Sequence, residues 1–158
     1  APAGDEPAAA AAAEVPPTAT HMPPEALAAT LLDRRDAAGA AAAIDVLAGG
    51  DADHPALKAL RARLAFVELA TAIRAAVSLR ESLAANPDDS AARHALAAHH
   101  AVMGDFATAL GEWLELMRRD RKFGDEAARR SLLQAFDVLG EQDPFVIQYR
   151  RKMASLLH

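Results

Sequence analysis

From residue 22 onward, apolar residues recur at helical spacing, and short breaks interrupt this pattern at regular intervals. Large aliphatic or aromatic side chains return every three or four positions, as they do on the buried face of an amphipathic helix. Pro23-Pro24 and Asp143-Pro144 have the composition of helix starts, whereas Gly104 and Gly140 have that of helix ends. The pattern predicts eight helices, over residues 23–34, 37–48, 55–68, 70–85, 89–103, 106–120, 125–139 and 144–157.

The composition agrees with an all-α fold. Hydrophobic residues make up 52% of the chain, but much of this share is alanine, and aromatic residues contribute only 4%. Alanine is the best helix former because its side chain loses no rotamer freedom, and the β-branched residues that favour strands are few. Short connections between the eight segments predict about four antiparallel helix hairpins.

The first 21 residues differ in composition from the rest. Alanine and proline dominate this segment. In residues 1–20, no apolar side chain larger than that of Val15 is present to anchor a core. Each proline removes a backbone hydrogen-bond donor and interrupts a helix. We therefore expect residues 1–21 to be a flexible linker or tail, and residues 22–158 to form one helical domain.

The region that starts at Ser90 carries a repeat signature. When Ser90 is the first position of a 34-residue frame, the side chains fall on the consensus positions of a tetratricopeptide repeat, a helix–turn–helix unit with small residues where its helices cross. These positions are Leu96, Ala97, His100, Gly104, Ala109, Trp113 and Leu116. The frame predicts that Trp113 is buried against the first helix of its own hairpin.

The segment from His21 to His54 fits the same frame more loosely. It matches through Leu27, Ala28, Leu31, Ala40, Ile44 and Leu47, with Arg35 where the turn usually has glycine. Residues 55–89 and 125–158 are each long enough for two helices, but they lack the consensus residues of the repeat. The sequence thus predicts a tetratricopeptide-like right-handed superhelix.

The order of these units resembles a particular family. Asn86-Pro87-Asp88-Asp89, Gly104-Asp105-Phe106 and the ending Tyr149-Arg150-Arg151 are similar to the C-terminal repeat region of the bacterial thioredoxin-like co-chaperones, the YbbN or chaperedoxin family. The resemblance covers residues 22–158 and is most specific from residue 86 onward. It implies a cytoplasmic protein that holds unfolded clients and hands them to a chaperonin.

The sequence departs from this family in one respect. The family carries an N-terminal thioredoxin-fold domain, and the 158 residues contain neither its strands nor a Trp-Cys motif. The chain is then either the C-terminal part of a longer protein or a stand-alone relative. We favour the first interpretation, because an Ala/Pro-rich linker is suited to joining two such domains, and we expect an upstream thioredoxin-fold domain in the intact protein.

Residues that could support catalysis or metal binding have simpler explanations. The chain has no cysteine, so it has no thiolate nucleophile and no cysteine zinc site. His94, His99 and His100 lack the spacing of ligands on one helical face, and we interpret them as core or surface residues. Four carboxylates lie at predicted helix starts, where they would cap free N–H groups: Asp88, Asp89, Asp125 and Asp143. We expect no catalytic residues, no metal and no cofactor.

Charge argues against two classes of partner. Seventeen Lys and Arg residues against 22 Asp and Glu give a net charge of −5, which does not favour nucleic-acid binding. No apolar run approaches the roughly 20 residues needed to span a bilayer. The sequence therefore predicts protein partners, with no nucleic acid and no membrane.

Two surfaces are candidates for binding a protein. Tetratricopeptide arrays bind ligands on the first helix of each hairpin, and in the best repeat that face is small and apolar: His94, Ala98, Ala101 and Val102. Such a groove suits extended hydrophobic client segments, unless it packs against a neighbouring helix. The second surface is a basic patch of Arg130, Arg151 and Lys152, which would dock an acidic partner such as a chaperonin or simply be a solvated face. The alternative function is a structural scaffold or oligomerisation domain that holds no client.

Overall fold

The computed structural model describes residues 22–72 and 75–158, and in these ranges the chain folds into eight helices and contains no strand. The helices are α1 (Pro24–Asp33), α2 (Ala37–Gly50), α3 (Leu57–Ala72), α4 (Ala76–Ala85), α5 (Ser90–Val102), α6 (Phe106–Arg119), α7 (Ala127–Leu139) and α8 (Pro144–Leu157). The predicted all-α fold is confirmed. The expected linker, residues 1–21, lies outside the described residues. In the described ranges, no helix combines the length and the apolar character needed to cross a bilayer.

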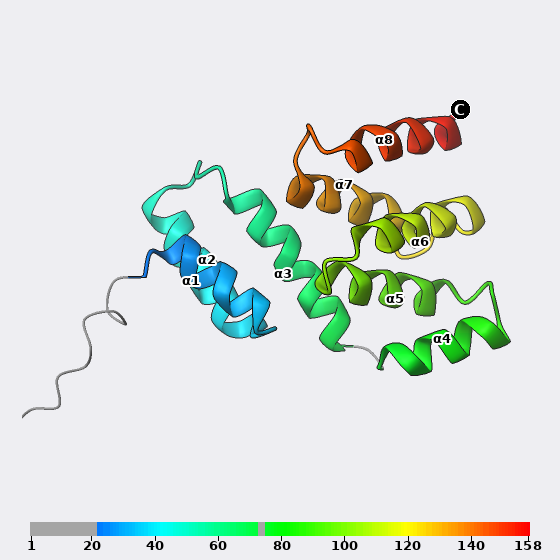
Figure 1. Ribbon diagram of the computed structural model, residues 1–158, viewed down its shortest axis with the longest axis horizontal. Coiled ribbons are helices and arrows are strands. Elements are labelled where there is room, and N and C mark those ends of the chain that lie inside the picture. The colour runs from blue at the N-terminus through cyan, green and yellow to red at the C-terminus, as the bar shows by residue number, and fades with distance from the viewer. Residues whose placement is uncertain (1–21, 73–74) are drawn as a thin grey trace, which may run out of the picture.

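Helix α3 is the central element of the arrangement (Figure 1). The hairpin of α1 and α2 packs on one side of α3, whereas α5 and α7 pack on the other. Helix α6 pairs with α5 and also contacts α7 and α8, and α4 lies along α5. The two hairpins that carry the repeat signature thus stand on either side of α3.

The turns of these two hairpins have the same construction. In the first turn, Asp36 caps α2 by accepting a hydrogen bond from the Gly39 amide. In the second, Asp105 caps α6 by accepting from the Thr108 amide. The residue before each aspartate has a left-handed backbone, with φ of 59° at Arg35 and 81° at Gly104. The repeat frame is therefore seen twice, and Arg35 occupies the position that favours glycine.

The packing of α3 and α4 differs from a simple hairpin. These consecutive helices do not pack closely against each other, and neither do α7 and α8. The reason is that α3 is apolar on two sides. Phe66 and Ala70 join the core formed with α5, α6 and α7, while Leu57, Leu60 and Val67 join the core formed with α1 and α2. Helix α4 contributes one fully buried side chain, Leu79, which packs with α5.

Two of the four predicted aspartate caps are present. Asp89 accepts from the Ala92 amide, and Asp143 accepts from the Phe145 amide. The capping role expected for Asp88 is wrong, because its carboxylate pairs with Arg119 at 2.7 Å. The role expected for Asp125 is also wrong. This residue has φ of 57° and lies before the N-cap, since α7 begins two residues later than predicted.

Candidate functional site

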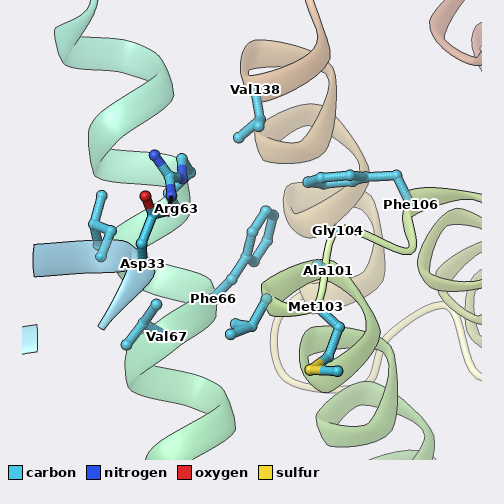
Figure 2. Close-up of a pocket in the computed structure, with 11 residues that line it drawn as sticks. Asp33, Arg63, Phe66, Val67, Ala101, Met103, Gly104, Phe106 and Val138 are labelled. Atoms are coloured by element: carbon cyan, nitrogen blue, oxygen red, sulfur yellow. Dashed lines mark hydrogen bonds and ion pairs between the residues drawn. The ribbon is translucent and has the colours of Figure 1, made fainter. Parts of the chain in front are cut away.

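A mostly apolar cavity of about 320 Å³ lies where α1, α3, α7 and the turn between α5 and α6 meet (Figure 2). Phe66 and Val67 reach it from α3, Phe106 comes from the start of α6, and Val138 comes from α7. The remaining lining residues are Leu32, Asp33, Arg63, Ala101, Val102, Met103 and Gly104. Cavities that hold one or two large apolar side chains or a small ligand have about this volume.

The rim of the cavity combines an ion pair with an exposed apolar side chain. Arg63 donates to the Asp33 carboxylate at 2.7 Å, which joins α3 to α1 on one edge. On the opposite edge, Met103 is 71% exposed. The guanidinium of Arg35 lies 2.9 Å from the Met103 sulfur, so the two repeat turns touch each other beside the cavity. An exposed methionine next to an apolar hollow is a surface that adapts to apolar side chains of different shapes.

The core behind the cavity is organised around Trp113, which is fully buried as the repeat frame predicts. Its ring stacks on Phe66 with centroids 5.0 Å apart, and its indole N–H donates to His94 Nδ1 at 3.1 Å. His94 also packs edge-on against Phe123. Burial, and second the positive charge of Arg130, lower the pKa of His94 to about 4 from its usual value near 6.5. His94 is therefore neutral near pH 7, and its Nδ1 lone pair is occupied by Trp113.

A tetratricopeptide repeat family profile matches residues 69–158. The chain belongs to the tetratricopeptide repeat family. Proteins of this family generally mediate protein–protein interactions, and the match includes the turn at Gly104 and the two cavity-lining residues of α5, Ala101 and Val102. No curated protein and no solved structure matches the chain.

The groove predicted on the first helix of the repeat is largely covered. Ala98 is fully buried and Ala101 nearly so, because α3 packs against this face of α5. Ala98 therefore packs against a neighbouring helix and is not open to a ligand. His94 faces the core, where it accepts from Trp113. Only Ala101 and Val102 reach the cavity. The predicted groove is thus accessible only at the end of α5, next to the turn at Gly104.

Sequence reasoning missed the most exposed member of the site. Helical spacing places Met103 on the apolar stripe of α5, whereas the structure places it at the C-cap with its side chain in solvent. The signal was available in the next residue, because Gly104 ends the helix and turns the preceding side chain away from the core. The contribution of α3 was also missed, since no repeat signature marks Phe66 or Arg63.

The other two histidines of α5, His99 and His100, do not line this cavity. His100 Nδ1 lies 3.1 Å from the Asp105 carboxylate, so it ties the end of α5 to the cap of α6. His99 Nε2 is buried and has no hydrogen-bond partner among the residues that the structure describes. Within the same ranges, no group of three histidines or carboxylates is positioned to hold a metal ion.

The three residues of the predicted basic patch differ in their contacts. Arg130 donates to the carbonyl oxygens of Gly124 and Asp125 and so fastens the loop before α7. Arg151 and Lys152 are exposed on α8 and form no ion pair with any described residue. The Lys152 ammonium lies 4.7 Å from the Tyr149 ring centroid, a cation–π contact that holds it against the helix surface. The charge available to a partner therefore comes from Arg151 and Lys152.

Proposed function

We propose that the chain is the protein-binding repeat module of a thioredoxin-like co-chaperone, which holds unfolded client segments and docks a chaperonin. One observation carries the client-holding role: the exposed Met103 side chain beside the apolar cavity formed by Phe66, Val102, Phe106 and Val138. The resemblance to the YbbN or chaperedoxin family supports the same role. A bacterial cytoplasmic location and an upstream thioredoxin-fold domain belong to this proposal.

The shape of the site favours weak binding of extended segments over tight binding of a folded partner. The cavity has room for one or two apolar side chains, and specific interfaces between folded proteins bury about 1,600 Å² in total. Because methionine has three rotatable bonds and a polarisable sulfur, Met103 can contact many different apolar side chains. Low selectivity of this kind is what a holder of unfolded chains requires.

The experiment is an aggregation assay with a chemically denatured test protein. The isolated chain should suppress the light scattering that follows dilution of the denaturant. Met103→Gln should weaken this suppression severalfold, because it replaces the apolar rim by a polar group of similar size. The fold should not change, since exposed substitutions alter the free energy of unfolding by about 0.5 kcal/mol or less.

Val46→Gln is the matched control. Val46 is 63% exposed on α2, it does not line the cavity, and its substitution removes an apolar side chain from the surface in the same way. Suppression that is unchanged by Met103→Gln, or reduced equally by Val46→Gln, would contradict the cavity as the client site. No suppression by the wild-type chain would favour the alternative, a scaffold without client binding.

A further inference from the structure

A second cavity lies on the other side of the two repeat turns. It has a volume of about 420 Å³ and is bounded by the end of α1, the start of α4 and the end of α5. Its lining residues are Arg35, Ala75, Ala76, Arg80, His99, His100 and Met103. Met103 lines the apolar cavity as well, so the two cavities share this side chain.

The second cavity has a different chemical character. Two arginines and two histidines line it, together with alanine side chains that leave space between them. In the part of the chain that the structure describes, neither Arg35 nor Arg80 forms an ion pair with a carboxylate. The guanidinium of Arg35 instead contacts the Met103 sulfur, which is a weak acceptor. The charges of the two arginines are therefore not neutralised by a carboxylate of the described residues, whereas His100 lies 3.1 Å from the Asp105 carboxylate.

The backbone at Arg35 gives an independent observation. With φ of 59°, Arg35 occupies a left-handed position that disfavours any residue with a Cβ atom, and the equivalent turn position in the second repeat is Gly104. Arginine thus stands where glycine would be more stable. A strained residue whose charged group lines a cavity is a candidate for a binding role.

We propose that the protein segment bound by this domain carries an acidic side chain next to its apolar one, and that Arg35 and Arg80 bind this carboxylate while the apolar side chain enters the neighbouring cavity. Arginine suits this role because its planar guanidinium pairs with a carboxylate through two hydrogen bonds. The buried Nε2 of His99 lies in the same wall. This inference rests on the proposed function, since it defines the partner of the same site.

The test compares two synthetic peptides by fluorescence anisotropy. Both contain leucine and phenylalanine; one places glutamate beside these residues, and the other has glutamine at the same positions. Both are amidated, so that no terminal carboxylate is present. We expect the glutamate peptide to bind about tenfold more tightly at low salt, with a preference that shrinks as the ionic strength rises.

Variants then locate the carboxylate. Arg80→Gln should reduce the affinity for the glutamate peptide about three- to fivefold and leave the affinity for the glutamine peptide unchanged. Arg35→Gly should also reduce the preference for the glutamate peptide over the glutamine peptide, and it should not lower Tm, because glycine relieves the left-handed backbone. Arg34→Gln is the matched control: it removes the same charge from an exposed neighbour that does not line this cavity.

Each outcome decides between the proposals. Equal affinity for the two peptides would overturn the acidic specificity and leave the apolar site in place. A preference for glutamate that survives both Arg35→Gly and Arg80→Gln, or that Arg34→Gln removes equally, would also overturn it. If neither peptide binds, the proposed function fails together with the inference.

Discussion

Acid should destabilise this protein through His94, because the folded state keeps that imidazole neutral. Burial, and second the positive charge of Arg130, lower the pKa of His94 to about 4, while the unfolded chain has the usual value near 6.5. The unfolded state therefore takes up a proton first as the pH falls. The stability that depends on neutral His94 is fully present above about pH 6.5 and is lost between about pH 6.5 and 4.

The size of the effect follows from the difference between the two pKa values. The loss relative to neutral pH is about 2 kcal/mol near pH 5 and approaches about 3 kcal/mol below pH 4. The structure explains why the folded state cannot adapt. Protonated His94 would lose its role as acceptor for the Trp113 N–H, which lies 3.1 Å away, and would place a charge beside Phe123.

The assay is denaturant unfolding near pH 7 and near pH 5, followed by the fluorescence of Trp113, which is the single tryptophan. His94→Gln keeps an acceptor for the indole N–H but does not titrate. This variant should therefore lose about 2 kcal/mol less stability than the wild type between the two pH values. His158→Gln, at the exposed end of the chain, should behave like the wild type. If His94→Gln and the wild type lose the same stability, His94 is protonated in the fold without cost and the reasoning is wrong.

Two further predictions concern the core and the basic surface. Trp113→Ala should reduce the free energy of unfolding by ~3–5 kcal/mol, measured by denaturant titration followed by circular dichroism, because it empties a fully buried site that contacts Phe66 and His94. A near-neutral result would contradict the repeat frame. Charge reversal by Arg151→Glu with Lys152→Glu should weaken binding to a chaperonin in a titration across a salt series, while the melting temperature hardly changes, because both side chains are exposed. Unchanged binding would leave these two residues as a solvated face.

The sequence was most informative where local chemistry determines the structure. Gly104 and Asp105 define a turn because glycine accepts a left-handed backbone and aspartate caps the next helix, and both effects act within a few residues. Trp113 was correctly placed in the core because its position within a repeat fixes which side of α6 it occupies. These features depend on short-range rules and could be predicted without a structure.

The partners of α3 could not be predicted in this way. Its side chains are apolar around much of the helix, so periodicity alone does not say which side meets α1 and α2 and which meets α5 and α7. The burial of the predicted groove could not be predicted for the same reason. Ala98 and Ala101 are covered by α3, which the repeat frame assigns to another unit. The cavity residues Phe66 and Arg63 were missed for this reason as well.

The position of α3 has a consequence for how the domain unfolds. In a regular solenoid each unit contacts only its neighbours, so end units can fray while the middle persists. Here Phe66 and Val67 are adjacent in sequence, yet they belong to two different cores. Disruption of the first hairpin exposes one side of the helix whose other side supports Trp113. We therefore expect loss of order in the first hairpin to weaken the support of Trp113, so that α1, α2 and the central core unfold together.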